Sequence, residues 1–82
     1  MRLDKFLAVS RLVKRRTIAQ QACEAGRVLV NGAAAKPSRE VKVGDKLEIG
    51  FGARKVAVKI LQVPSGSVRK EQAEALYTSL SP

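Results

Sequence analysis

The sequence predicts an α+β fold, with two N-terminal helices packed on a small, mostly antiparallel sheet and a short helix at the C-terminus. Apolar residues recur at helical spacing before residue 26, alternate with polar residues between 28 and 60, and return to helical spacing after residue 70. With 82 residues, the chain has room for one domain with a small core. An enclosed catalytic pocket is not expected at this size, so a binding module is favoured over an enzyme.

The first helix is expected over residues 3–12, because four residues of this stretch share one face at spacing i, i+3, i+4 and i+7: Leu3, Phe6, Leu7 and Ser10. The second helix is expected over residues 15–25, with Gly26 as its C-terminal stop. Thr17 and Gln20 could instead form a capping box, which would start this helix slightly later. Both starts remain open from the sequence.

From residue 28 the apolar period changes from helical to two. A strand at 28–30 and a return strand at 34–36 are joined by Asn31-Gly32, a pair that favours a type I′ turn because both positions need positive φ. Two longer strands follow at 46–51 and 55–60. Their apolar side chains are expected to share one face: Leu47, Ile49, Phe51, Val56, Val58 and Ile60.

Residues 1–64 are expected to form the domain, and residues 65–82 a linker with a C-terminal helix. The linker begins around the Pro64–Ser67 stretch. The helix follows from an apolar stripe formed by Ala73, Leu76, Tyr77 and Leu80. This stripe could pack on the chain's own sheet or bind a partner; internal packing is the commoner arrangement.

Positive charge is concentrated at the start of the chain. Sixteen Lys and Arg residues against 7 acids give a formal net charge of +9. Six of the basic residues fall in the first 20 positions, beside a single acid, Asp4. We expect Asp4 to orient arginines or to stabilise the helix terminus, and we expect a polyanion as the partner. The six basic residues are therefore the first candidate RNA contacts: Arg2, Lys5, Arg11, Lys14, Arg15 and Arg16.

Other classes of function are disfavoured by composition. The chain has no His and one Cys, so zinc sites, Cys/His dyads and Ser/His/Asp triads are not expected, nor is a cofactor. No apolar run is long enough for a membrane span, and no signal core follows Met1. With a lone Cys23 unable to form an internal disulfide, these features predict a cytoplasmic protein without a membrane partner.

Structured RNA is the favoured polyanion. Side chains cannot enter the deep major groove of A-form RNA, so a compact basic helix pair would recognise backbone and shape. The three aromatic residues all lie on apolar stripes, which argues against a stacking surface for single strands. Arg11 could alternatively pair with Asp4 or Glu24 in a structural role. Arg2 and Arg16 are expected to be exposed contacts whose loss would leave thermal unfolding nearly unchanged.

Several ordered motifs across residues 1–50 closely resemble the ribosomal-protein-S-four-type RNA-binding domain, or alpha-L motif. These are Arg2-Leu3-Asp4-Lys5-Phe6-Leu7, Arg16-Thr17-Ile18-Ala19, Gly26 through Gly32, Pro37-Ser38 and Gly44-Asp45. The resemblance implies that the two helices and the first hairpin form one RNA-binding surface, with Lys36 and Arg39 as outer contacts. One position departs from the family pattern: many members carry Ser or Thr where this chain has Arg15.

Among stand-alone members, residues 14–17 and 71–77 are most similar to the RqcP type of bacterial ribosome-associated quality control. This resemblance implies a non-catalytic protein that docks on rRNA and tRNA of stalled large ribosomal subunits carrying peptidyl-tRNA. There it would support alanine tailing of the nascent chain by an elongation factor of the RqcH type. We expect it to act as a monomer.

Three other functions are compatible with parts of this sequence to different degrees. The alternative in the same class is a heat-shock-type factor that recycles large subunits carrying a nascent chain. A pseudouridine synthase would need a large catalytic domain with an essential Asp, which residues after 64 do not supply. A DNA-associated regulator would also fit phosphate and shape recognition, and competition between structured RNA and duplex DNA would distinguish it.

Overall fold

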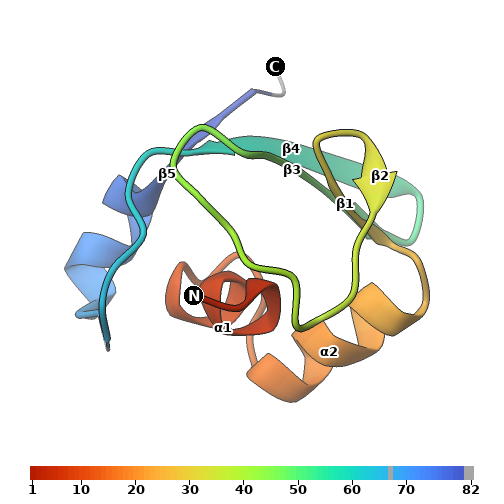
Figure 1. The fold of residues 1–82 in the computed structure, drawn as a ribbon, viewed down its shortest axis with the longest axis horizontal. Helices are drawn as coiled ribbons and strands as arrows, with labels where there is room; N and C mark the ends of the chain where they lie inside the picture. Colours follow the sequence, from red (N-terminus) through yellow and green to blue (C-terminus); the bar gives the residue numbers. More distant parts are fainter. Residues whose placement is uncertain (67, 81–82) are drawn as a thin grey trace.

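The computed structural model describes residues 1–66 and 68–80 (Figure 1). Ser67 of the expected linker and residues 81–82 of the expected C-terminal segment lie outside the described residues. The elements in chain order are α1 (Leu3–Val9), α2 (Arg16–Glu24), β1 (Val28–Val30), β2 (Ala33–Ala34), β3 (Lys46–Phe51), β4 (Arg54–Ile60), the 3₁₀ helix η1 (Lys70–Leu76) and β5 (Tyr77–Ser79).

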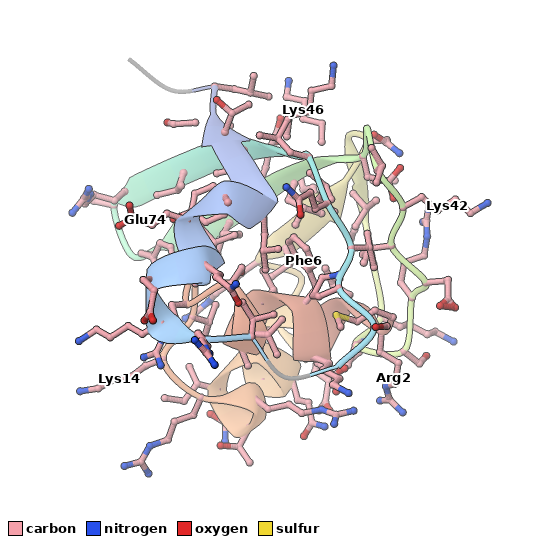
Figure 2. All side chains as sticks on the ribbon, turned by 90° about the vertical axis from the view of Figure 1, so that its left-hand side faces the viewer. Arg2, Phe6, Lys14, Lys42, Lys46 and Glu74 are labelled. Carbon is pink, nitrogen blue, oxygen red and sulfur yellow. The ribbon has the colours of Figure 1, made fainter. Side chains whose placement is uncertain are left out.

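The strands form one antiparallel sheet in the order β2-β1-β3-β4-β5, and α1 and α2 lie together on one side of it (Figure 1). The register pairs Leu47 with Val58 and Val28 with Ile49, so the alternating apolar side chains meet on the helix side. Phe6 of α1 is fully buried between the layers (Figure 2). The predicted α+β class and the helix-on-sheet arrangement are confirmed.

The β1–β2 hairpin has the turn that the sequence predicts. Asn31 and Gly32 have φ values of +53° and +87°, as a type I′ turn requires. The Asn31 side chain also accepts a hydrogen bond from the Lys46 amide at 3.0 Å and donates one to Asp45 at 3.1 Å. These bonds fix the turn against the start of β3. The return strand is Ala33–Ala34, shorter and one residue earlier than the predicted 34–36.

The first helix is shorter than predicted. It ends at Val9 instead of residue 12, and Arg11 adopts a left-handed conformation with φ of +61°. Val13 donates its backbone N–H to the Leu7 carbonyl at 3.0 Å and is itself buried. The reversal at Arg11 brings Val13 into the core, and this burial favours ending the helix early over extending it.

The second helix lies within one residue of the predicted range 15–25 at each end, so the structure supports the earlier of its two predicted starts. Arg15 is its N-cap, with extended backbone and no side-chain capping bond, and Arg16 is the first helical residue. The later start at a Thr17 capping box is wrong. Gln20, the expected partner in that box, instead donates its side-chain N–H to Asp4 of α1 at 2.9 Å.

The C-terminal stripe is only partly helical. Ala73 and Leu76 are buried on η1, as predicted, but Tyr77 starts strand β5 and pairs with Ile60. Leu80 is 46% exposed beyond the strand, so the predicted helical positions of Tyr77 and Leu80 are wrong. Pairing with β4 satisfies backbone groups along an edge that a longer helix would leave open.

Candidate nucleic-acid interface

A fully buried carboxylate holds two arginines at the contact between α1 and α2. Asp4 is 0% exposed, and it accepts hydrogen bonds from Arg2 through Nε at 3.2 Å and Nη2 at 3.3 Å. It also accepts one from Arg16 through Nε at 3.2 Å. Together with Gln20, which binds the same carboxylate, these residues form what we call the Asp4 cluster: Arg2, Asp4, Arg16 and Gln20.

The cluster keeps Asp4 charged despite its burial. Burial acts to raise the pKa of Asp4, but side-chain bonds from Gln20, Arg16 and Arg2, with the Lys5 amide at 2.8 Å, act in the opposite direction. The net result is a pKa below the ordinary value of 3.8. Asp4 is therefore an anion at neutral pH, and its position between two guanidinium groups confirms the expectation that it orients arginines.

Local sequence spacing builds this arrangement. Arg16 and Gln20 are four residues apart, so they project from the same side of α2. The start of α1 is held by the loop after β2, because Leu3 and Asp4 donate their backbone N–H groups to the Arg39 and Pro37 carbonyls at 2.7 and 3.1 Å. The loop thereby satisfies helix donors that would otherwise lack partners.

Both arginines of the cluster keep part of their surface in solvent. The side chains of Arg2 and Arg16 are 50% and 45% exposed. Among the described residues, Arg16 donates only through Nε, so both of its Nη groups remain available to a ligand. Two cations share one anion, and the cluster retains net positive charge. Both arginines also bind buried Asp4, so each makes a structural contact, and the effect of replacing either one on thermal unfolding stays a prediction.

The loop contacts extend the basic surface around the cluster. Arg39 donates its N–H to the Lys36 carbonyl at 3.0 Å in a turn beside the start of α1, and both side chains are exposed. Lys5 is half-buried on α1, and Arg15 is exposed at the N-cap of α2. Six of the predicted residues thus surround the N-terminal ends of the two helices: Arg2, Lys5, Arg15, Arg16, Lys36 and Arg39.

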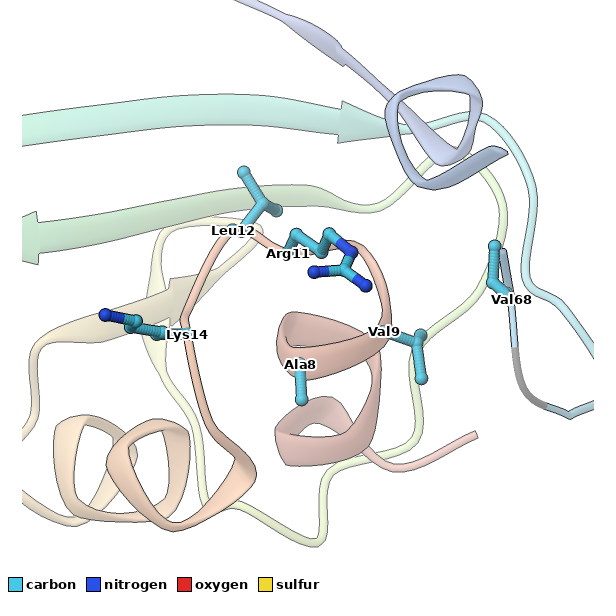
Figure 3. A pocket seen from close by; sticks show the side chains of 6 residues that line it. All are labelled: Ala8, Val9, Arg11, Leu12, Lys14 and Val68. Carbon is cyan, nitrogen blue, oxygen red and sulfur yellow. The ribbon is translucent and has the colours of Figure 1, made fainter. Parts of the chain in front are cut away.

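Arg11 and Lys14 lie beyond the other end of α1. They line an open cleft of about 540 Å³ with Val9, Leu12 and Val68 (Figure 3). Figure 2 shows Lys14 directed into solvent away from Arg2. Neither ion pair considered for Arg11, with Asp4 or with Glu24, is formed within the part of the chain that the structure describes. The predicted cations therefore form two groups.

Sequence reasoning missed two features. The sequence offers Gln20 only as a possible capping-box partner of Thr17, although its spacing from Arg16 indicates a shared helix face. Phe51 was placed in the core because it alternates with Leu47 and Ile49, but its position at the end of β3 leaves it 43% exposed. The expectation that every aromatic ring is covered is therefore wrong.

Over residues 1–66 and 68–80, the structure contains no helix long and apolar enough to cross a membrane. The same residues contain no group of three or more His, Cys, Asp or Glu side chains suited to hold a metal ion. Cys23 is buried, and burial, with the nearby negative charges of Asp4 and Glu24, raises the pKa of its thiol to about 11.

Comparison with known proteins assigns this two-helix and hairpin unit to a class. Residues 1–47 match the S4 domain family, and this stretch contains the whole Asp4 cluster. The RQC P-site tRNA stabilizing factor of Halalkalibacterium halodurans is 57% identical over 94% of this chain and 86% of its own length. The protein of the same name from Bacillus subtilis is 48% identical over 98% of this chain and 92% of its own length. The chain belongs to this family of S4-domain proteins.

Solved structures show the same fold. The trimeric structure of Vibrio cholerae Heat Shock Protein 15 superimposes with a TM-score of 0.89 at 31% identity, covering 99% of this chain and 82% of that one. The solution structure of the hypothetical protein HP1423 gives a TM-score of 0.85 at 36% identity, covering 100% and 99% of the two chains. The β5 strand and η1 thus belong to an architecture that these relatives share over nearly the full chain.

Proposed function

We propose that this protein is a cytoplasmic, non-catalytic RNA-binding factor of ribosome-associated quality control. It binds rRNA and tRNA on stalled large ribosomal subunits that carry peptidyl-tRNA. It supports alanine tailing of the nascent chain by an elongation factor of the RqcH type, and it acts as a monomer. RNA binding is assigned to residues 1–64. The names of the most similar relatives support the quality-control role, and the observation that carries RNA binding is the Asp4 cluster.

The cluster suits phosphate recognition because its arginines are held in place before any ligand arrives. A guanidinium fixed through Nε presents its Nη edge to a phosphate, and its side chain loses less conformational freedom on binding than an unrestrained one. Lys36 and Arg39 add positive charge beside the cluster. A phosphate backbone crossing the ends of α1 and α2 would meet all of these groups.

The second group of cations supports contact with more than one RNA segment. Arg11 and Lys14 are separated from Arg2 by the length of α1, and they border an open cleft away from the Asp4 cluster. One group would hold rRNA and the other tRNA, so that the tRNA is kept in a productive position between tailing steps. This action requires no bond change by the protein itself.

The test is the tail on a nascent chain encoded by a message without a stop codon. In the host, deletion of the gene is expected to abolish alanine tails, measured by mass spectrometry of the reporter's C-terminus. Wild-type protein should restore them. The Arg16→Ala protein should not restore the tails. The Lys59→Ala protein should restore them, because Lys59 lies on the sheet face away from the helices. Immunoblots would establish equal protein levels. Unaltered alanine tails in the deletion strain would contradict the proposal.

A second function in the same class is favoured by the likeness to Heat Shock Protein 15. A Heat shock protein 15 homolog of Aeromonas salmonicida is 34% identical over 94% of this chain, although the chain covers only 58% of that protein. If alanine tails persist without the gene while large subunits accumulate with stranded peptidyl-tRNA, the recycling role would be the correct one.

A further inference from the structure

A partly apolar cleft lies between α2 and the end of β3, apart from both groups of cations. It has a volume of about 320 Å³, and its lining includes Ile18 and Ala22 of α2 together with Arg27 and Phe51. Ile18 is 45% exposed and Phe51 43% exposed. In this small domain, the cleft thus gathers two of the large apolar side chains that reach solvent.

The sheet fixes the aromatic ring beside positive charge. The Gly50 amide donates to the Arg27 carbonyl at 2.9 Å, which holds Arg27 next to Phe51. Across the β3–β4 hairpin, Phe51 is paired with Arg54 and Gly50 with Lys55. Arg54 therefore shares the sheet face of Phe51, whereas Lys55 projects from the opposite face. Arg27 and Arg54 are exposed and form no ion pair within residues 1–66 and 68–80.

The chemistry of the cleft identifies its occupant. An apolar protein segment would cover Phe51 but would leave the surrounding cations without partners. A nucleotide satisfies both features, because its base can stack on the ring and its phosphates can meet the cations. The base must be unpaired, since a base inside a duplex has both of its faces covered by neighbours.

We propose that this cleft binds one unpaired nucleotide of RNA, with its base stacked on Phe51 and its phosphates beside Arg27 and Arg54. This inference rests on the proposed RNA binding and adds the kind of RNA structure that is recognised. Successive residues of α2 are rotated by 100°, so Ile18 and Ala22 face away from Arg16. The cleft therefore lies on a different side of α2 from the Asp4 cluster, and an RNA that fills both places its paired part on the cluster and its bulge or loop around α2 in the cleft.

Tryptophan fluorescence gives a direct test, because the chain contains no Trp. The Phe51→Trp protein is mixed with an RNA hairpin that carries one bulged nucleotide, and separately with the same hairpin without the bulge. We expect the bulged RNA to quench the fluorescence and the fully paired RNA to quench it much less. Leu61→Trp is the matched control, since Leu61 is 46% exposed and lies outside the cleft. Equal quenching of Phe51→Trp by both RNAs would overturn the proposal.

Affinity measurements separate base stacking from simple apolar contact. Phe51→Leu keeps an apolar side chain without a ring, and we expect it to weaken binding of the bulged hairpin about tenfold, as loss of one stacked base would. Binding of the fully paired hairpin should not change, and thermal unfolding of the variant shows whether the fold is kept. If Phe51→Leu binds both RNAs like the wild type, the cleft is not a nucleotide site, although the proposed function stands.

Two other results have distinct meanings. If neither hairpin binds at low salt, the proposed RNA binding fails and this inference fails with it. If Phe51→Ala loses ribosome association while both hairpins bind as before, the cleft serves a protein partner, and the nucleotide assignment is overturned.

Discussion

Replacing Asp4 with Asn separates the geometry of the cluster from its charge. The substitution preserves shape but removes the carboxylate that Arg2 and Arg16 share, and it raises the formal net charge from +9 to +10. If RNA affinity depended only on total charge, Asp4→Asn would bind more tightly. If oriented guanidinium groups carry the affinity, it should bind more weakly, by about tenfold or ~1.4 kcal/mol.

The same substitution should destabilise the fold. Breaking a buried ion pair costs about 3–5 kcal/mol when the remaining charge stays buried. Here the partners Arg2 and Arg16 are 50% and 45% exposed, so water can compensate them in part. We therefore expect a loss of about 2 kcal/mol in the free energy of unfolding. For a domain of this size, that loss lowers Tm by on the order of 10 °C.

The assay compares Asp4→Asn with Glu24→Gln, which makes the same change in charge at an exposed position outside the cluster. Thermal unfolding is followed by circular dichroism at pH 7, and binding to purified large ribosomal subunits is measured well below both Tm values. Glu24→Gln should unfold like the wild type and bind slightly more tightly. Tighter binding by Asp4→Asn, or an unchanged Tm, would refute the reasoning about the cluster.

Three further outcomes are expected. The folded pKa of Asp4 lies below 3.8, so the stability that Asp4 contributes is complete above that pH and is lost as the pH falls through the folded pKa. Denaturant titrations should show a smaller loss of stability in acid for Asp4→Asn than for the wild type, and identical pH profiles would contradict this expectation. The thiol pKa of about 11 predicts that native Cys23 is alkylated slowly at pH 8. It also predicts a loss of stability between pH 9 and 11 in the wild type that Cys23→Ala does not show. Fast labelling of the folded protein would show that burial does not raise the thiol pKa. Arg11 has a φ of +61°, which glycine adopts without strain, so Arg11→Gly should raise the free energy of unfolding by about 0.5–1 kcal/mol. The same variant should bind large subunits more weakly. A lower free energy of unfolding in the variant would argue against backbone strain at Arg11.

The fold followed from the sequence where local signals and burial agree. The alternation of Leu47 and Ile49 and the Asn31-Gly32 turn specify strands and a hairpin whatever surrounds them. The last segment could not be predicted in this way, because Tyr77 becomes a strand residue only when the edge of β4 is present to pair with it. The predicted end of the first helix was wrong for a similar reason. The helix stops at Val9 because the chain after it turns back to bury Val13 in the core, a contact that local sequence does not reveal.

The site was predictable as a list of residue types and not as a geometry. Charge density marked Arg2 and Arg16 as candidates, but only the crossing of α1 and α2 brings both to one carboxylate. Phe51 was missed because alternation gives the face of a strand without giving how far the covering helices extend.

Arg15 shows how the cluster couples folding to binding. A Ser or Thr at this N-cap position would accept a bond from a backbone N–H of the first turn, whereas Arg15 makes no side-chain cap bond. The first turn of α2 is held instead by side chains, because Arg16 and Gln20 both bind Asp4 of α1. An RNA phosphate that engages Arg16 therefore acts on the group that anchors this turn. We expect bound RNA to protect the backbone amides at the start of α2 from hydrogen exchange more than those at its end, and equal protection along the helix would show that the anchor and the binding site are independent.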